Sequence, residues 1–159
     1  MAEEPTEIFA GAKIGASPEG ASEQDAEEQI FQTFTARHLE ELRMLVGADR
    51  VVADDNENGA EALEAYSHDF TEDLHFKPSV AVLARSAEEV SKVLAFATRE
   101  RIPATPRGAG TGLSGAALPV RGGIVLSLEK MNRILEIDTN NLMAVGEPGV
   151  ITEVLQNAV

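Results

Sequence analysis

A stretch dense in glycine constrains this chain more than any other part of its sequence. Residues 107–115 read Arg-Gly-Ala-Gly-Thr-Gly-Leu-Ser-Gly, with four glycines in the last eight positions. Glycine adds no packing and loses the most backbone entropy on folding, so this density indicates special backbone conformations or a close approach to a ligand. Successive N–H groups in such a loop can point into one anion-binding concavity. The stretch predicts a phosphate- or pyrophosphate-binding loop, and the alternative is a glycine-rich turn between two strands.

Spacing excludes two common phosphate loops. A Walker A loop needs lysine and a hydroxyl residue after its last glycine, and Ala116–Ala117 stand there. The Rossmann pattern Gly-x-Gly-x-x-Gly is present over Gly110–Gly115, but its glycines must open a crossover helix. Only residues 116–123, which include a proline and a Gly-Gly pair, precede the next apolar run at Ile124. A helix does not form there.

The segments around the loop predict a strand–helix–strand unit. The run Val80–Ala84 is apolar without alternation, as in buried parallel strands. A capping box at Ser86–Glu89 begins a helix that ends near Arg101. Strands are then predicted at Ile102–Pro106 and Ile124–Leu128, on either side of the glycine-rich loop. The loop therefore leaves the carboxyl end of a strand, where ligands bind in parallel sheets.

Shorter elements are predicted on both sides of this unit. Hydrophobic periodicity predicts a helix over about Ala26–Val46, ended by Gly47. The other expected elements are a strand at Val51–Ala53, a short helix at Ala60–Ala65, strands at Ile134–Asp138 and Leu142–Val145, and a final helix capped by Thr152. The last strand and the final helix are expected to present apolar faces that nothing in the chain covers.

Composition limits the classes of function. With 159 residues the chain is at most one domain, and residues 1–28 form an acidic extension that we expect to be disordered. A formal charge of −14 argues against a nucleic-acid surface. No apolar run is long enough for a membrane span, and no signal peptide is evident. The absence of cysteine is compatible with the cytoplasmic location that we expect.

Two histidines raise the question of a metal site. His68 and His75 lie near Asp69, Glu72 and Asp73 in the sequence. Their spacing matches no zinc pattern, so we predict a polar loop and no metal ligands.

Residues 102–115 resemble the pyrophosphate loop of FAD-linked oxidases of the vanillyl-alcohol oxidase / p-cresol methylhydroxylase (PCMH) type. Within that group they most resemble the branch of the glycolate oxidase FAD subunit and D-lactate dehydrogenase. The similarity extends over roughly residues 36–159. Its other blocks are Tyr66–Asp69, Lys77–Val82, Ser86–Val90, Gly123–Leu128, Met131–Ile134 and Val145–Val150.

The resemblance implies an α+β fold, the first subdomain of a PCMH-type FAD-binding domain, with a small, partly parallel sheet flanked by helices. It implies FAD as cofactor, with its pyrophosphate held by backbone amides of residues 108–112 and the Ser114 hydroxyl. Arg107 would add charge or orient the loop, and Pro148–Val150 would let the flavin or ribityl chain approach. The expected cofactor-binding residues are Pro106, Arg107, Gly108, Ala109, Gly110, Thr111, Gly112, Leu113, Ser114, Gly115, Pro148, Gly149 and Val150. Since no histidine lies in the loop, attachment is expected to be non-covalent.

The resemblance also implies an activity, the FAD-dependent oxidation of a small 2-hydroxy acid of the glycolate or D-lactate type. Partner subunits for electron transfer are expected, and no catalytic base is identifiable. The alternatives are another alcohol or sugar as substrate, or a non-catalytic fragment. Residues 29–75 are expected to form a helical segment and lead-in, and residues 76–159 an FAD-binding domain that the family continues past Val159. This chain alone is therefore expected to hold FAD weakly and to be inactive.

Overall fold

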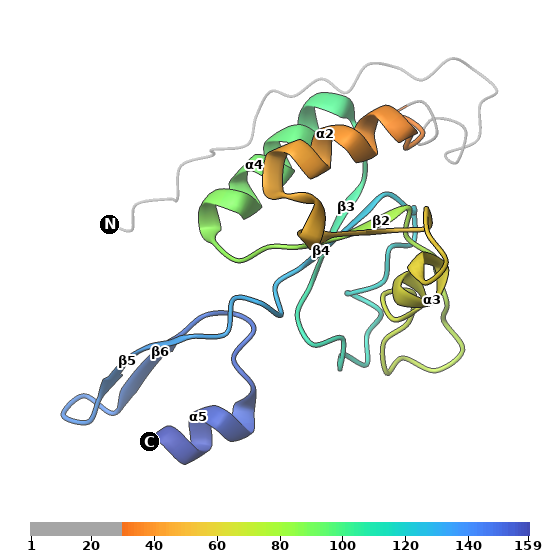
Figure 1. The fold of residues 1–159 in the computed structure, drawn as a ribbon. Helices are drawn as coiled ribbons and strands as arrows, with labels where there is room; N and C mark the ends of the chain where they lie inside the picture. Colours follow the sequence, from red (N-terminus) through yellow and green to blue (C-terminus); the bar gives the residue numbers. More distant parts are fainter. Residues whose placement is uncertain (1–29) are drawn as a thin grey trace, which may run out of the picture. The chain divides into compact units, whose positions relative to one another are not determined.

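A four-stranded sheet in the order β1–β2–β4–β3 lies at the centre of the computed structural model, which describes residues 30–159 (Figure 1). The strands are β1 (Val51–Ala53), β2 (Val80–Leu83), β3 (Ala104–Arg107) and β4 (Ile124–Ser127). Strand β4 pairs in parallel with β2 and β3, and β1 pairs antiparallel with β2 at one edge. The predicted partly parallel sheet and the strand–helix–strand unit are confirmed.

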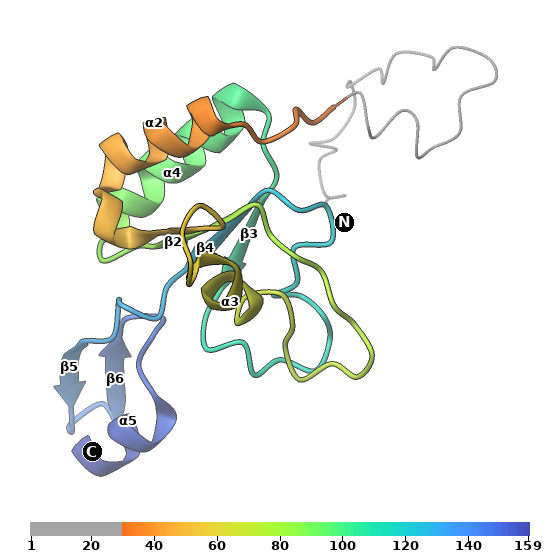
Figure 2. The same ribbon diagram turned by 45° about the vertical axis from the view of Figure 1, so that its right-hand side comes forward.

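Helices cover both faces of this sheet. Side chains alternate along each strand, so Val80 and Val82 enter the larger core together with Phe96, while Ala81 packs with Leu63 on the opposite face. The larger core is covered by α2 (Ala36–Val46) and α4 (Ala87–Glu100), which lie side by side (Figures 1 and 2). The short helix α3 (Gly59–Glu64) supplies Leu63 to the other face. Burial on both faces explains why the parallel strands read as continuous apolar runs.

Helix α4 begins and ends where the sequence predicts. The Ser86 hydroxyl accepts a hydrogen bond from the Glu89 N–H at 3.3 Å, and Arg101 caps the carboxyl end in the left-handed conformation. Only half of the expected capping box forms. The Glu89 carboxylate accepts the Arg85 N–H at 2.9 Å and pairs with Arg50.

Helix α2 starts ten residues later than the periodicity predicts, at Ala36, and the prediction of helix over residues 30–35 is wrong. Thr35 is extended, with φ −129° and ψ 167°, and forms a capping box with His38. The Gln32 N–H donates to the Arg101 carbonyl at 2.9 Å, which holds the preceding segment against the end of α4. Phe34 still packs against the larger core, but from outside the helix. The capping box at Thr35 therefore fixes the start of α2, even though the helical spacing of apolar residues continues before it.

The carboxyl-terminal part of the chain contains a two-stranded antiparallel hairpin and a last helix. These are β5 (Ile134–Asp138), β6 (Met143–Gly146) and α5 (Thr152–Ala158). The N-cap of α5 is Ile151 and Thr152 is its first helical residue, so the prediction that Thr152 caps this helix is wrong. A single 3-10 turn, η1 (Ala48–Arg50), follows α2.

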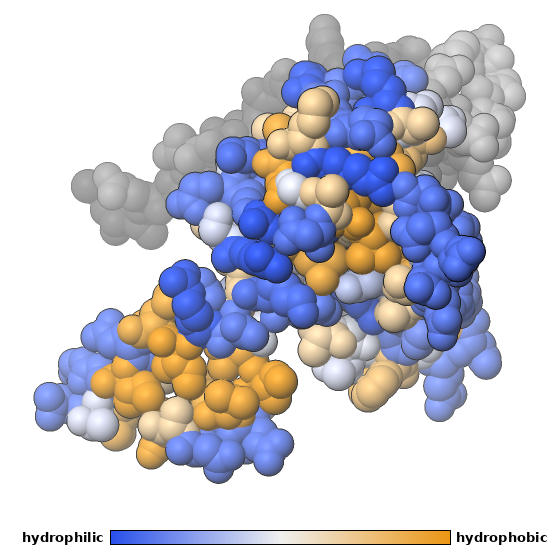
Figure 3. Space-filling model, viewed as in Figure 1, coloured by the Kyte–Doolittle hydropathy of each residue, from blue (hydrophilic) through white to orange (hydrophobic). Residues whose placement is uncertain are grey.

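Apolar side chains gather on the exterior of this carboxyl-terminal part (Figure 3). Leu142 is 90% exposed and Ile151 is 64% exposed. The other exposed apolar side chains of this part are Leu135, Ile137, Met143, Val145, Val154 and Val159. This confirms the expected uncovered apolar faces on the last strand and helix.

The predicted acidic extension over residues 1–28, and the start of the helix predicted from Ala26, lie outside the described residues. Among residues 30–159, no helix combines the length and apolar character that a bilayer span requires.

Candidate cofactor-binding site

The glycine-rich loop leaves the sheet at its carboxyl-terminal edge. Strand β3 ends at Arg107, which lies in register with Ser127 at the end of β4, and Ser127 in turn pairs with Leu83 at the end of β2. The Leu128 N–H donates to the Arg107 carbonyl at 2.9 Å. This hydrogen bond is the last between the two strands, and beyond it the segments that follow β3 and β4 separate. Parallel sheets bind ligands at this edge.

The backbone amides of the loop, apart from that of Gly115, are unpaired within the part of the chain that the structure describes. Among the described residues, none accepts a hydrogen bond from the backbone N–H of residues 108–114. Thr111–Ser114 are exposed, whereas Gly110 is buried and has a φ of +71°. Gly115 also has a positive φ, +69°, and its N–H donates to the Thr71 hydroxyl. The positive φ values explain two of the four glycines.

The Arg107 side chain lies underneath the loop. The residue is 8% exposed, and its Nη2 donates to the Ala65 carbonyl at 3.1 Å. Its guanidinium carbon is 5.9 Å from the centre of the Tyr66 ring. A Cβ added to Gly110 would lie 2.1 Å from Arg107 Nη2, so the guanidinium sits directly against that glycine. Of the two roles expected for Arg107, this geometry favours orienting the loop.

A second segment, residues 66–76, supports the loop from the side. The Phe70 N–H donates to the Gly112 carbonyl at 3.1 Å, and the Gly115 N–H donates to the Thr71 hydroxyl at 2.7 Å. The Thr71 N–H in turn donates to Asp69 Oδ1 at 2.8 Å. These contacts were not predicted from the sequence. The available signal was the Tyr66–Asp69 block, which belongs to the same resemblance as the loop.

Asp69 is the most buried carboxylate next to the loop, with 7% of its surface exposed. Burial raises its pKa, but hydrogen bonds from Thr71 and the positive charge of Arg107 lower it more, so the pKa lies below its ordinary value. Asp69 Oδ2 and Arg107 Nη1 are both buried and have no hydrogen-bond partner among the described residues. Buried unpaired polar atoms of this kind are costly and are typical of a site that a ligand or ordered water completes.

The loop fits an anionic cofactor. A Cβ added to Gly108 would meet nothing within 4 Å, so space is open beside the unpaired amides. At Gly112 the nearest atom to an added Cβ would be Asp69 Oδ2, at 3.8 Å. Open space, unpaired amide donors and the unpaired Arg107 Nη1 suit a phosphate group, which only accepts hydrogen bonds. Asp69 Oδ2 is an acceptor and needs a donor, such as a ligand hydroxyl or an ordered water.

Pro148–Val150 were predicted as the second part of the site, and they lie in a turn over residues 147–150. Here the Gly149 N–H donates to the Met131 carbonyl at 2.8 Å, and an added Cβ would lie 2.4 Å from the Leu128 carbonyl oxygen. The chain's own backbone therefore requires glycine at this position. Arg133 braces the turn, because its N–H and guanidinium both bond the Glu147 carboxylate and thereby lower the Glu147 pKa. Leu128 follows β4, and its carbonyl oxygen lies against Gly149 while its N–H donates to the Arg107 carbonyl. The two predicted segments are therefore linked through the end of β4.

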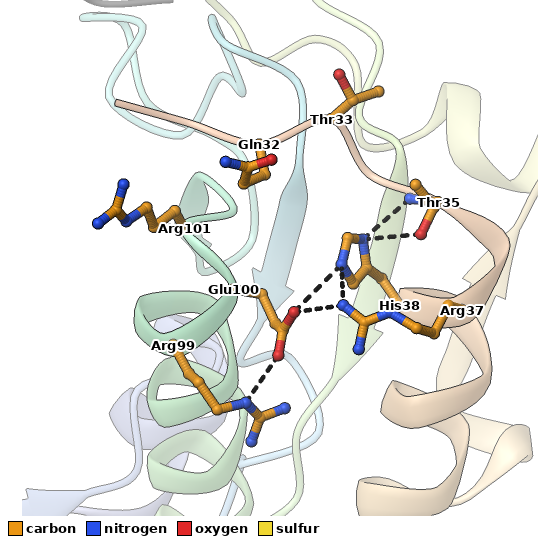
Figure 4. A pocket seen from close by; sticks show the side chains of 8 residues that line it. All are labelled: Gln32, Thr33, Thr35, Arg37, His38, Arg99, Glu100 and Arg101. Carbon is orange, nitrogen blue, oxygen red and sulfur yellow. Dashed lines mark hydrogen bonds and ion pairs between the residues drawn. The ribbon is translucent and has the colours of Figure 1, made fainter. Parts of the chain in front are cut away.

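A hollow of about 380 Å³ lies elsewhere, between the start of α2 and the end of α4 (Figure 4). Glu100 accepts hydrogen bonds from Arg99 Nε at 2.8 Å and from Arg37 Nη2 at 2.5 Å. These bonds lower its pKa to about 2. His38 lies beside the same carboxylate, with its Nε2 3.5 Å from Glu100 Oε2, and accepts the Thr35 N–H on its other ring nitrogen. The groups of this network satisfy one another and tie α2 to α4.

Comparison with curated proteins finds flavin oxidoreductases. Glycolate oxidase subunit GlcD of Bacillus subtilis is 44% identical over 87 residues, which is 55% of this chain and 18% of that protein. D-2-hydroxyglutarate dehydrogenase of Stutzerimonas stutzeri is 36% identical over 118 residues, covering 74% of this chain and 24% of the relative. D-lactate dehydrogenase of Archaeoglobus fulgidus is 48% identical over 79 residues, covering 50% and 18% respectively. The chain therefore spans only about a fifth of the length of these relatives.

Solved structures show the same fold. A p-cresol methylhydroxylase with substrate bound superposes with a TM-score of 0.67 and 27% identity, over 89% of this chain and 25% of that one. 4-Ethylphenol oxidase from Gulosibacter chungangensis superposes with a TM-score of 0.65 and 27% identity, over 91% and 26%. The predicted fold class, part of a PCMH-type FAD-binding domain, is confirmed.

One family model, described as an FAD binding domain, matches residues 78–159, the half of the chain that holds the parallel strands, the glycine-rich loop and the 147–150 turn. The resemblance seen in the sequence is confirmed, and the chain belongs to the FAD binding domain family.

Proposed function

We propose that residues 106–115, together with Pro148–Val150, hold the pyrophosphate and adjoining part of FAD, and that residues 76–159 are the FAD-binding part of the chain. The observation that carries this is the row of amides over residues 108–114, at the carboxyl edge of the sheet, which have no acceptor among residues 30–159. Amides aimed at one concavity stabilise negative charge without side chains.

Each neighbouring side chain has a supporting task in this proposal. Arg107 fixes Gly110 from below, and Asp69 with Thr71 fixes the far end of the loop through Gly115. The buried positive charge of Arg107 also favours an anion above it. When bound, FAD supplies the capacity to accept a hydride.

Non-covalent attachment of FAD is part of the proposal. The chain has no cysteine and three histidines, His38, His68 and His75, none of which lies in residues 106–115. His38 is a buried residue of α2, and the other two lie in the segment that follows α3.

For the substrate we propose a small 2-hydroxy acid of the glycolate or D-lactate type. The names of the relatives support this class, since glycolate oxidase, D-lactate dehydrogenase and D-2-hydroxyglutarate dehydrogenase all act on 2-hydroxy acids. The glycolate oxidase relative is named as a subunit, which supports partner subunits for electron transfer. The described residues contain no group to which we assign the role of catalytic base.

Amide NMR tests the cofactor site directly. Titrating the ¹⁵N-labelled chain with FAD, ADP and riboflavin should shift the amides of residues 108–114 with FAD and ADP. Riboflavin lacks the pyrophosphate and should leave them in place. Shifts confined to other regions, or equal shifts with riboflavin, would refute the assignment.

The substrate class is tested on the complete gene product that carries this segment. Anaerobic mixing of its FAD-loaded form with glycolate, D-lactate or D-2-hydroxyglutarate should bleach the flavin absorbance. Bleaching by p-cresol and by none of the acids would instead place the protein with the phenol-oxidising structural relatives.

A further inference from the structure

A cluster of metal-ligating side chains lies outside the glycine-rich loop, where α3 ends. Glu64 is the last residue of α3, His68 follows four positions later, and His75 returns to the same place after the excursion of residues 69–74. The Phe76 N–H donates to the Ser67 carbonyl at 2.8 Å and closes the neck of this excursion. One ligand atom from each of Glu64, His68 and His75 lies within 4.8 Å of the other two.

The three side chains already face one another. His75 Nε2 is 2.6 Å from Glu64 Oε1 and 2.9 Å from the Ser67 hydroxyl. That hydroxyl donates to the Glu64 carbonyl at 2.6 Å, so it accepts from His75, and the His75 proton lies on Nε2. The rings of His68 and His75 are parallel within 10°, with their centres 5.9 Å apart. Among the described residues, no lysine or arginine forms an ion pair with Glu64.

We propose that Glu64, His68 and His75 form a binding site for a divalent transition-metal ion, for which Zn²⁺ is the probe. Two imidazole nitrogens and one carboxylate oxygen are a usual ligand set for zinc, with water in the fourth position. Imidazole ligands favour zinc over Mg²⁺ and Ca²⁺, which prefer oxygen donors. When His75 Nε2 binds the ion, the ring proton moves to Nδ1, so the imidazole stays neutral. All three side chains are exposed and can turn toward a common ion.

The position of the site gives it a structural consequence. A bound ion would join the two ends of the 64–75 segment, and the middle of that segment contacts the glycine-rich loop through Phe70 and Thr71. An ion that binds only the folded chain raises its stability, and the gain grows with the logarithm of the ion concentration relative to Kd. Zn²⁺ is therefore expected to raise the thermal unfolding midpoint of the chain.

The sequence alone did not indicate this ligand set. Asp69, Glu72 and Asp73 are the acidic residues nearest the two histidines in the sequence, but they are not members of the cluster. The third ligand comes from the end of α3, and only the fold of the following segment places it there.

Zinc titration of the metal-free full chain by calorimetry tests the proposal, with the three histidine rings followed by ¹⁵N NMR. We expect one ion per chain and shifts of the His68 and His75 ring nitrogens, while His38 serves as an internal control. His68→Ala, His75→Ala and Glu64→Gln should each weaken binding at least about tenfold, a loss that even an outer-sphere partner of a metal can cause. Glu72→Gln, in the same segment, should bind as the unchanged chain does.

Three results would overturn the site. The first is that the chain takes up no Zn²⁺ in a saturable way. The second is that the ring ¹⁵N resonances of His68 and His75 do not move when Zn²⁺ is added. The third is a His68→Ala/His75→Ala double variant that binds Zn²⁺ as tightly as the unchanged chain. Far-ultraviolet circular dichroism shows whether each variant folds. The ¹⁵N ring measurement needs no substitution, so it tests the site even where a variant does not fold.

Discussion

Gly108 and Gly149 lie in the two segments that were predicted to contact FAD, and an added Cβ meets opposite surroundings at the two positions. At Gly108 it would meet nothing within 4 Å. At Gly149 it would lie 2.4 Å from the Leu128 carbonyl oxygen and 2.9 Å from that of Met131. The first glycine faces open space beside unpaired amides, and the second packs against the chain's own backbone.

This difference separates two reasons why a position in such a segment is glycine. Where the backbone of the protein itself fills the space, glycine is needed for folding, and the residue says nothing about a ligand. Where the space is open and the amides are free, a ligand is the better explanation. Gly110 lies between these cases, because its φ of +71° and the guanidinium of Arg107 constrain it from the protein side.

Gly110→Val should have the largest effect. Valine at this position would have to adopt the positive φ of Gly110. It would also displace the buried Arg107 guanidinium, whose Nη2 lies 2.1 Å from an added Cβ. We expect the free energy of unfolding to fall by roughly 2–6 kcal/mol, since backbone strain and overpacking each contribute about 1–3 kcal/mol. FAD affinity should fall more than about 100-fold, equivalent to ~2.7 kcal/mol. Urea unfolding measures the first effect, and a fluorescence titration of the complete gene product with FAD measures the second.

If Gly110→Val kept both its stability and its FAD affinity, Arg107 would not support the loop as described. Gly110→Ala provides a graded control, since it retains the positive φ requirement with a smaller side chain.

Gly149→Ala should lower stability by about 1–3 kcal/mol, the usual cost of overpacking a tight contact. The clash is with backbone carbonyls, so the turn and the 128–131 segment must move apart. Thermal unfolding followed by circular dichroism measures the loss. Gly108→Ala is the matched control and should stay within about 0.5 kcal/mol of the unchanged chain. Equal losses in the two variants would remove the contrast between the two glycines.

Gly108→Ala should instead weaken FAD binding. A methyl group in the open space beside the amides would meet the pyrophosphate, and we expect a loss of at least about tenfold, or ~1.4 kcal/mol. The measurement is the same fluorescence titration, with ADP as a competitor that displaces FAD. Ala116→Ser, at an exposed position just after the loop, is the control. Unchanged affinity for both ligands would show that the open side of the loop is not where the phosphates bind.

Glu100→Gln should have the smallest effect, confined to acidic solution. Hydrogen bonds from Arg99 and then Arg37 lower the pKa of Glu100 from 4.5 to about 2. A carboxyl whose pKa is depressed on folding contributes stability that is present above pH 4.5 and is lost as pH falls toward 2. The variant should therefore lose stability at neutral pH and show a flatter pH dependence across that window. The effect should shrink in high salt, because these groups are partly exposed.

Thermal unfolding between pH 2 and 7 measures this dependence. Glu40→Gln, which removes another carboxylate that is 67% exposed and pairs with Arg43, is the control and should keep the slope of the unchanged chain. A parallel pH dependence for Glu100→Gln and the unchanged chain would contradict the depressed pKa.

Much of the architecture was determined by local sequence. Continuous apolar runs at Val80–Leu83 and Ile124–Ser127 indicated parallel strands because both faces of this sheet are covered. Ser86 and Arg101 mark the ends of α4 because capping depends on residues within one turn. The glycine density of residues 107–115 indicated an anion-binding loop for the same reason, since the conformational freedom of glycine is a property of the residue itself.

Contacts between distant segments were decided only by the tertiary structure. Thr35 ended the helical periodicity because its side chain and the bond from Gln32 to Arg101 stabilise an extended chain there. Asp69 and Thr71 support the glycine-rich loop from more than 40 residues away in the sequence, as the 44-residue separation of Gly115 and Thr71 shows. Glu64 joins two histidines because α3 ends beside them. Local pattern specifies which backbone conformations a segment prefers, whereas these partners depend on how folded segments pack, and packing depends on the whole chain at once.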